Sequence, residues 1–439
     1  MTIQGAFELP DRKVDFSFNG SLLITAAAEN AGIMLNTRCA GKGSCGGCAV
    51  DLLAGRFALN GETFTIEPGA RRRVLGCRTA ILEGPCRIAV PARSLVQTGM
   101  QVLDSFVMPA SLNLKPLVRK IHLTLANPTL DDSVGDFERI VRALRADHGF
   151  GPIRPTLETL QQLPDLLTGA GYDVTVTVAE NYGLWEMIRV EPGDTAGALY
   201  ALAVDIGTTT VVSALIDLNT ARLVDSASSY NQQVQRCDDV ASRIIYADDP
   251  ARLKDLQRLI IDETLNRHIR TLCDANGITP HDIARAVVSG NSVMTHLLLG
   301  VNPRNMGGIP FQPGASDPGT FRARSLGLAI NPTGFVDVIP SISAYVGGDI
   351  TSDIHLVGMI DNPKLTMVID VGTNAEIALG DRTGILATAT PAGPAYEGAG
   401  ISCGLRACAG AIEHITIAPG DFAIACTVIG GDRQKPAGV

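Results

Sequence analysis

The sequence predicts a chain of several domains, in which a small α+β unit precedes larger units of the α+β and α/β classes. Three observations predict this organisation. The 439 residues suffice for about three domains of ordinary size. Four cysteines gather within the first 77 residues. A strand–turn–strand pattern that reads D-x-G-T at its turn occurs twice in the second half of the chain.

Composition excludes several classes of protein. Hydrophobic residues make up 46% and charged residues 18%, which excludes a disordered or fibrous chain. A net charge of −9 and an aromatic content of 5% disfavour nucleic acid as a partner. No apolar run reaches the length of a membrane span, and residues 1–16 lack a signal-peptide pattern. We therefore expect a cytoplasmic protein with reduced thiols and no membrane partner.

Charge is divided unevenly along the chain. Residues 1–93 hold 11 Lys and Arg against 8 Asp and Glu, a net charge of +3, whereas the remainder carries −12. Such asymmetry indicates separately built units. We expect a first domain at 1–93, a linker at 94–116, a small α+β domain at 117–198 and a third domain at 199–439.

The first domain carries a metal-ligand pattern. Cys39, Cys45 and Cys48 are spaced C-x5-C-x2-C, and 28 residues separate Cys48 from Cys77. Four thiolates can hold two irons, and the glycines of the loop let backbone N–H groups approach the cluster sulfurs. Structural zinc sites more often show two C-x2-C pairs, and only one occurs here. The pattern favours a 2Fe–2S cluster over zinc.

Strands expected at 13–18, 49–53 and 87–90, with a helix at 22–31, complete a small β-grasp domain. These features resemble the 2Fe–2S ferredoxins, with the adrenodoxin-type cysteine spacing. Cys86 competes with Cys77 for the fourth ligand position, but Cys77 lies in an LGCRT turn that resembles the ferredoxin pattern. Cys86 is interpreted as a packed thiol. The absence of a G-x-G-x-x-G motif disfavours a flavin-dependent reductase.

The small domain at 117–198 shows elements without evident chemistry. A strand at 121–125, helices at 133–149 and 156–163 and a strand at 173–178 predict an α+β unit.

A phosphate-binding turn is predicted after residue 200. The run ALAVDIGTTTVVSALID reads as a strand ending at Asp205, a turn at Gly207, Thr208 and Thr209, and a second strand. A tight glycine turn presents N–H groups to a phosphate, and threonine hydroxyls add donors. The carboxylate of Asp205 can hold Mg²⁺, usually through water.

The same pattern recurs 165 residues later. TMVIDVGTNAEIALG contains Asp370, Gly372, Thr373 and Asn374, which align with the first hairpin and indicate an internal duplication. Two lobes that each present one phosphate hairpin resemble the actin-like superfamily, which includes acetate and sugar kinases. That resemblance implies ATP with Mg²⁺ in a cleft between the lobes, with Asp205 and Asp370 as catalytic carboxylates.

Elements between and after the hairpins fit this interpretation. Helices are expected at 247–278 and 345–354, and a strand, turn and helix at 282–300. Asn291 in that turn either lines the cleft or caps the helix. Glu397, in a Gly-rich stretch, is a candidate for orienting water or metal in catalysis.

The order of units resembles the reductive activators of corrinoid proteins. The resemblance rests on the four cysteines and on VDIGTTT, SGNSVMTHLLLG, DVGTNAEIAL and GPAYEGAGI. It implies ATP-dependent repair of a methyltransferase's corrinoid, in which a 2Fe–2S cluster gives one electron to Co(II) and forms Co(I). The implied partners are that corrinoid protein and an external low-potential electron donor. A homodimer is left open.

Three alternatives stay open at this point. One is a kinase for a small metabolite with a redox-sensing ferredoxin domain, and another is an electron carrier with a nucleotide-binding platform. A third is an activator of the 2-hydroxyacyl-CoA dehydratase type, but that type lacks a ferredoxin module. Only 69 residues follow Asp370, so we expect an incomplete second lobe from about residue 366, a truncated form, weak ATP binding and an exposed apolar edge.

Overall fold

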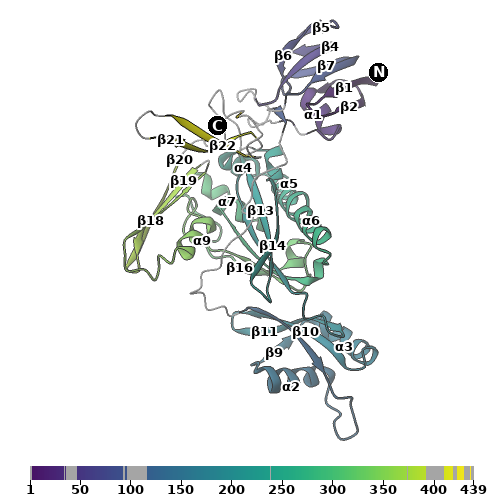
Figure 1. Ribbon diagram of the computed structural model, residues 1–439, viewed down its shortest axis with the longest axis vertical. Coiled ribbons are helices and arrows are strands. Elements are labelled where there is room, and N and C mark those ends of the chain that lie inside the picture. The colour runs from purple at the N-terminus through teal and green to yellow at the C-terminus, as the bar shows by residue number, and fades with distance from the viewer. Residues whose placement is uncertain are drawn as a thin grey trace.

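The computed structural model describes residues 2–33, 35, 47–91, 94–95, 116–237, 239–372, 374–391, 410–418, 423–429 and 436. The N-terminal unit lies at one end of the long axis, the unit at 117–198 lies at the other, and the nucleotide-binding lobes lie between them (Figure 1). Among the helices described, none is long and apolar enough to cross a membrane.

The N-terminal unit is a seven-stranded sheet with one packed helix. Its strands are ordered β2-β1-β7-β4-β5, with β3 paired to β7 and β6 paired to β4. In chain order the elements are β1 (Thr2–Glu8), β2 (Lys13–Asn19), β3 (Leu22–Leu23), α1 (Ile24–Asn30), β4 (Ala49–Leu59), β5 (Glu62–Ile66), β6 (Arg72–Leu75) and β7 (Thr79–Ala89).

The strands and helix expected in this unit are present, but two strands are longer. β4 continues six residues past its predicted end because Phe57 is fully buried in the same core and faces Phe64 on β5. β7 begins eight residues before its predicted start, because alternate residues such as Ile81 and Ile88 are buried on one face. The pattern of alternating burial therefore extends both strands.

The unit at 117–198 is a four-stranded sheet, ordered β8-β10-β11-β9, with two helices. In chain order its elements are β8 (Val118–Thr124), α2 (Asp136–His148), β9 (Ile153–Pro155), α3 (Leu157–Gly169), β10 (Asp173–Asn181) and β11 (Leu184–Pro192). Helix α2 ends at Gly149, whose φ of 69° fits glycine in the left-handed region.

The prediction that the second helix ends at residue 163 is wrong. α3 continues through Pro164 to Gly169. A proline inside a helix removes one backbone hydrogen bond. Here Leu163 and Leu167 are both buried on the core side while Pro164 is exposed, so burial of the flanking leucines offsets that loss.

The first lobe of the third unit is built on a six-stranded sheet, ordered β14-β13-β12-β15-β17-β16. β12, β15 and β17 are parallel, and β12, β13 and β14 form an antiparallel meander. In chain order the elements are β12 (Tyr200–Ile206), β13 (Thr210–Asp217), β14 (Arg222–Tyr230), η2 (Gln232–Gln235), α4 (Val240–Tyr246), α5 (Pro250–Ile260), η3 (Ile261–Leu265), α6 (Asn266–Asn276), η4 (Pro280–Asp282), β15 (Ile283–Gly290), α7 (Ser292–Leu299), η5 (Arg304–Gly307), β16 (Gly319–Arg322), α8 (Ala323–Leu326) and β17 (Phe335–Val338).

The long helical segment expected at 247–278 is confirmed as α5 and α6 joined by the π-helical turn η3. It ends at Gly277, whose φ is 64°. One face of this segment supplies Leu256, Ile260 and Ile269 to the main core, which also takes residues from β12 and β15. The core thereby fixes the sheet whose strand ends carry the first phosphate turn.

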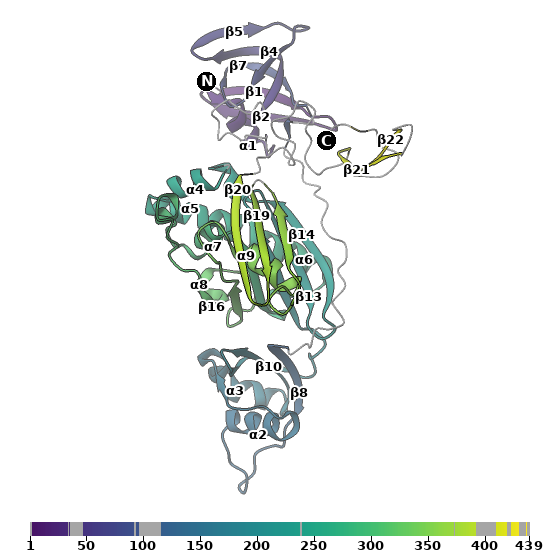
Figure 2. The ribbon, with the colours of Figure 1, turned by 90° about the vertical axis from the view of Figure 1, so that its left-hand side faces the viewer.

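The second lobe contains a three-stranded antiparallel sheet of β18, β19 and β20, packed against helix α9, and a separate strand pair (Figure 2). The second hairpin expected at 366–380 is therefore confirmed. The elements are α9 (Gly348–Leu356), β18 (Thr366–Val371), β19 (Asn374–Asp381), β20 (Gly384–Pro391), β21 (Ile412–Ile417) and β22 (Ile424–Val428). On the sheet, Met367, Leu379 and Leu386 face one another across the strands and are 58%, 42% and 80% exposed.

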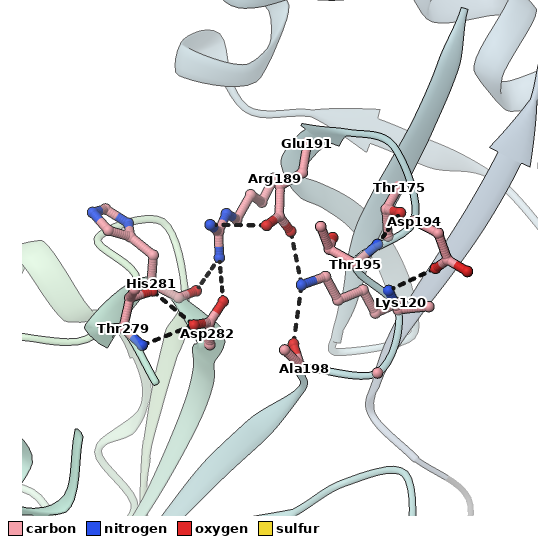
Figure 3. Close-up of polar contacts among 12 residues, drawn as sticks. Lys120, Thr175, Arg189, Glu191, Asp194, Thr195, Ala198, Thr279, His281 and Asp282 are labelled. Carbon is pink, nitrogen blue, oxygen red and sulfur yellow. Dashed lines mark hydrogen bonds and ion pairs between the residues drawn. The ribbon is translucent and has the colours of Figure 1, made fainter. Parts of the chain in front are cut away.

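The unit at 117–198 is bound to the first lobe by a polar network (Figure 3). The Arg189 guanidinium contacts Glu191 within its own unit, and its Nη1 donates to the His281 carbonyl (2.7 Å) and to Asp282 (3.1 Å) in the lobe. Buried Lys120 contacts Glu191 and donates to the Ala198 carbonyl at 3.0 Å. Hydrogen bonds from Thr279 and Arg189 outweigh the effect of burial and lower the pKa of Asp282.

A small apolar core crosses the same boundary. Ile188 and Ala179 come from the small unit, whereas Ala284 and Phe335 come from the first lobe. All four are at most 3% exposed. Because an apolar core and paired charges span the boundary, the two parts form one packed body rather than loosely tethered domains.

Candidate nucleotide cleft and iron–sulfur site

The first predicted phosphate turn lies where β12 ends and β13 begins. A β-carbon at Gly207 would lie 2.6 Å from the Thr210 carbonyl oxygen, so the tight turn requires glycine. The Gly207 carbonyl accepts from Asn231 Nδ2 (3.0 Å), and the Thr209 carbonyl accepts from the Asn231 backbone N–H (2.8 Å). The turn is thus fixed from the protein side by its carbonyl oxygens.

Arg243 on α4 provides the third anchor of this turn. Its Nη2 donates to the Thr208 carbonyl at 2.6 Å, and its Nε donates to the Cys237 carbonyl at 3.2 Å. The side chain is fully buried, and Nη1 also contacts Gln233 and Met294. Sequence reasoning missed Arg243, because nothing near it in the chain links it to a turn 35 residues earlier.

Asn291 fulfils both roles that the sequence left open. Its Oδ1 accepts from the Met294 N–H and caps α7, while its Nδ2 donates to Thr208 Oγ1 at 3.0 Å. A β-carbon at Gly347, just before α9, would lie 2.5 Å from Asn291 Cα. The starts of α7 and α9 therefore meet beside the first turn.

The second hairpin joins β18 to β19. Asp370 lies next to the end of β18 and is paired with Glu376 on β19. The Gly372 N–H donates to the Asn374 carbonyl at 2.8 Å. Asn374 is exposed at the start of β19. Thr373 lies outside the described residues, as does Glu397.

The two hairpin aspartates are close enough to influence each other. The pKa of Asp205 is raised to about 6, chiefly because surrounding protein atoms desolvate the carboxylate, although the residue is exposed at the surface. The negative charges of Asp349, Asp370 and Asp353 add to the rise. Because Asp370 belongs to the second lobe, the structure brings both predicted hairpins to one concave surface.

Two further acids of this surface were missed by sequence reasoning. Burial raises the pKa of Asp349 to about 6 and that of Glu376 to about 7, and the charge of Asp370 raises both further. Asp349 lies in the first turn of α9, within the helix that the sequence expected near the phosphates. Glu376 lies two residues after Asn374, inside the second hairpin, so proximity to the motif was the available signal.

These acids do not form a ready-made metal cage. Within the described residues, no three or more His, Cys, Asp or Glu side chains are grouped closely enough to bind a metal ion directly. Crowded carboxylates with raised pKa values instead favour a cation that arrives with its own ligands. Magnesium bound to a nucleotide retains water and phosphate ligands, and therefore fits this surface.

Two of the four predicted cluster ligands are described, and they are neighbours. Cys48 and Cys77 are 1% and 6% exposed, and the Cys77 N–H points to Cys48 Sγ at 3.5 Å. The Gly76 N–H also donates to the Cys48 carbonyl at 2.9 Å. Backbone N–H groups aimed at a thiolate sulfur are typical of iron–sulfur sites, so the pair fits a cluster. Cys39 and Cys45 lie outside the described residues.

Cys86 lies in a different environment, inside the sheet. It is 1% exposed, its Sγ contacts the Gln4 carbonyl at 3.7 Å, and burial raises its pKa to about 11. A thiol with a raised pKa is a poor source of thiolate for iron. This environment supports the interpretation of Cys86 as a packed thiol.

Fold and site together define a class of protein: a 2Fe–2S ferredoxin unit joined to an actin-like nucleotide-binding unit. Four family descriptions match successive parts of the chain. They are the 2Fe-2S iron-sulfur cluster binding domain at 7–82, the RACo linker region at 110–197, the RACo middle region at 200–362 and the C-terminal domain of RACo, the ASKHA domain, at 364–439.

A solved structure described as a reductive activator for corrinoid, iron–sulfur protein is 32% identical, with a TM-score of 0.69, and the match covers 100% of this chain and 70% of that one. The chain belongs to the family of reductive activators of corrinoid proteins.

Two curated relatives agree. The corrinoid activation enzyme RamQ of Eubacterium limosum is 30% identical over 415 residues, which are 93% of this chain and 64% of that protein. The [Co(II) methylated amine-specific corrinoid protein] reductase of Methanosarcina barkeri is 28% identical over 227 residues, 49% of this chain and 40% of that protein. The chain thus spans less than two thirds of the length of either relative.

Proposed function

We propose that this chain carries out ATP-dependent reductive activation of a corrinoid protein. One electron passes from the ferredoxin unit to a Co(II) corrinoid, which becomes Co(I). An external low-potential donor then restores the electron to the ferredoxin unit. The proposal rests on one combination: a buried Cys48–Cys77 pair and two facing phosphate hairpins within a single chain.

The cluster, when bound, supplies single-electron chemistry. Cys39, Cys45, Cys48 and Cys77 are its proposed ligands. Burial of Cys48 and Cys77 excludes water from that side of the site, and the Cys77 N–H donates toward Cys48 Sγ. Hydrogen bonds to ligand sulfurs and solvent exclusion are the main protein controls on the potential of such a centre.

ATP is proposed to bind between the hairpins. The N–H groups and hydroxyls at Gly207, Thr208 and Thr209 are suited to phosphate, as are those at Gly372 and Asn374 with Thr373. Asp205 and Asp370 are proposed to hold the water ligands of Mg²⁺. Glu397 stays a proposed participant in orienting water or metal.

The acidic surface suggests why nucleotide would change the shape of the molecule. Asp205 on the first lobe repels Asp370 and Asp349, and this repulsion favours separation of the acids. A bound magnesium nucleotide offsets that repulsion and favours a closed arrangement. A partner that binds one arrangement preferentially would then be coupled to ATP.

The test is to mix the reduced chain anaerobically with a Co(II) corrinoid protein and to follow Co(I) absorbance with and without ATP. We expect Co(I) to form faster with MgATP. Equal rates under both conditions would refute the coupling. Stoichiometric phosphorylation of a small metabolite would support a kinase instead, and absence of nucleotide binding by calorimetry would support a plain electron carrier.

A further inference from the structure

A run of arginines surrounds the second described cluster ligand. Residues 68–82 contain Arg71, Arg72, Arg73 and Arg78 and no acidic residue, with Cys77 among them. All four arginines are exposed. Arg73 precedes Cys77 by four residues, a span of at most about 13 Å in an extended strand. The surface next to the proposed cluster is therefore strongly positive, in a unit whose net charge is +3 inside a chain of net charge −9.

Three of these arginines are held in place by anchors. Buried Asp51, whose side chain is 2% exposed, receives hydrogen bonds from Arg71 Nη2 and from Arg73 Nε and Nη2 at 2.5–2.9 Å. These arginines lower the pKa of Asp51 to about 2, with the Arg73 hydrogen bond as the largest cause. The Arg72 guanidinium stacks over the Phe64 ring, 4.1 Å from its centroid.

This anchoring has a consequence for binding. Long surface side chains normally lose rotamer freedom when a partner docks, and that loss weakens the complex. Here the side chains of Arg71 and Arg73 are already ordered while remaining 63% and 49% exposed. One buried carboxylate against two guanidinium groups also leaves a net positive charge. Elsewhere in the unit, Arg56 and Arg87 are paired one to one with Glu83 and Glu8.

The arginines lie on the outer side of the N-terminal unit. β4 and β5 lie at its end remote from the lobes, and α1 lies nearer to them (Figures 1 and 2); β6 pairs with β4. The pKa of Arg236 on the first lobe is raised mainly by its hydrogen bond to Asp255, but the charge of Glu29 on α1 contributes. A corrinoid partner sensitive to nucleotide must contact the lobes, and this leaves the arginine side open to another protein.

We propose that the surface formed by Arg71, Arg72, Arg73 and Arg78 docks the external electron donor, and that this donor is a small redox protein with an acidic surface. This inference rests on the proposed function, which requires such a donor. Opposite charges at the docking surfaces raise the association rate and orient the partners, and salt weakens both effects. The donor's redox centre would then lie against the Cys77 side of the unit.

The test uses an acidic flavodoxin as the probe and the full chain with its cluster. Oxidised flavodoxin is titrated at about 20 mM and about 300 mM salt, where screening differs strongly. The variant Arg72→Glu/Arg78→Glu spares the Asp51 anchor. Lys13→Glu/Arg12→Glu, on the opposite edge at β2, changes the net charge equally and serves as the matched control.

We expect flavodoxin to bind, with a Kd that rises with salt and that increases about tenfold in the Arg72/Arg78 variant at low salt. The control should stay within about twofold of the wild type. Reduction of the cluster by flavodoxin hydroquinone should slow in parallel, whereas reduction by an uncharged deazaflavin radical should not change.

Three results would overturn the proposal: no flavodoxin binding, equal weakening in the control, or a variant that slows only electron transfer to cobalt. The last result would assign the surface to the corrinoid protein. None of the binding measurements involves cobalt, so failure of this inference is distinguishable from failure of the proposed function.

Discussion

At the scale of residues, the proposed chemistry depends on a few side chains in unusual environments. Cys48 and Cys77 are buried neighbours, while Cys86 is packed in the sheet. Asp205 and Glu376 carry raised pKa values on the surface between the hairpins. Each of these environments makes a separate prediction.

The cysteine assignments predict different effects for two similar substitutions. Cys77→Ser removes a proposed ligand and should lower iron well below two atoms per chain. Cys86→Ser, the matched control, should retain two irons, because that thiol contacts only protein. Iron and sulfide analysis with EPR after anaerobic purification measures both. Loss of iron in the Cys86 variant alone, or a stoichiometric zinc atom in the wild type, would contradict the assignment.

The buried Arg243 should control nucleotide affinity without touching nucleotide. Arg243→Met fills a similar volume but leaves the Thr208 and Cys237 carbonyls without this donor. Loss of one such buried hydrogen bond costs about 1–3 kcal/mol, so we expect about tenfold weaker nucleotide binding by calorimetry. Arg236→Met, which loses only a partly exposed pair with Asp255, should keep the affinity. Unchanged affinity in a folded Arg243 variant would contradict this role.

Acidity of the cleft predicts opposite pH trends for stability and binding. The pKa values of Asp205 and Asp349 are raised to about 6 and that of Glu376 to about 7, so the folded state binds extra protons. This contribution to stability is full below about pH 4 and is lost as pH rises toward 7. Magnesium nucleotide needs the ionised acids, so its affinity should increase from pH 5.5 to 8.

Calorimetry in buffers of different ionisation enthalpy would detect the proton release that accompanies nucleotide binding. Glu376→Gln should reduce this release and flatten the fall in stability between pH 5 and 8. Glu62→Gln, an exposed carboxylate on β5, is the control and should change neither. A wild-type affinity that does not vary with pH would show that the acids do not take part.

At the scale of elements, local patterns were predicted well and long-range contacts were not. The two D-x-G-T hairpins were predictable because strand, turn and strand are adjacent in sequence. The continuation of α3 past Pro164 was not, because burial of Leu163 and Leu167 decides it. Arg243 reaches the first turn, and Asp349 reaches Asp205, only after folding, so sequence spacing gave no sign of either.

The boundary between the small unit and the first lobe should contribute strongly to stability. Phe335 on β17 is 1% exposed and packs in the core that includes Ile188. Phe335→Ala should lower the free energy of unfolding by about 3–5 kcal/mol. Phe311→Ala, at a position 41% exposed, should have a much smaller effect. Urea unfolding measures both, and equal losses would contradict the role of this core.

At the scale of the whole molecule, three units contribute to one proposed function. The N-terminal unit holds the electron, the lobes hold the nucleotide, and the unit at 117–198 is packed firmly on the first lobe. The order of units and the cluster cysteines were predictable from sequence, and the family assignment agrees with them. Incompleteness of the second lobe stays a prediction, although its sheet does expose Met367 and Leu386.

The central claim is that nucleotide binding in this chain controls delivery of one electron to cobalt. The most direct measurement is a single turnover of the reduced protein with a Co(II) corrinoid protein, with loss of the cluster's EPR signal and gain of Co(I) absorbance followed together. With MgATP, we expect one Co(I) to form for each reduced cluster lost, and only slow reaction with MgADP or without nucleotide. Equal rates and yields under all three conditions would contradict the account.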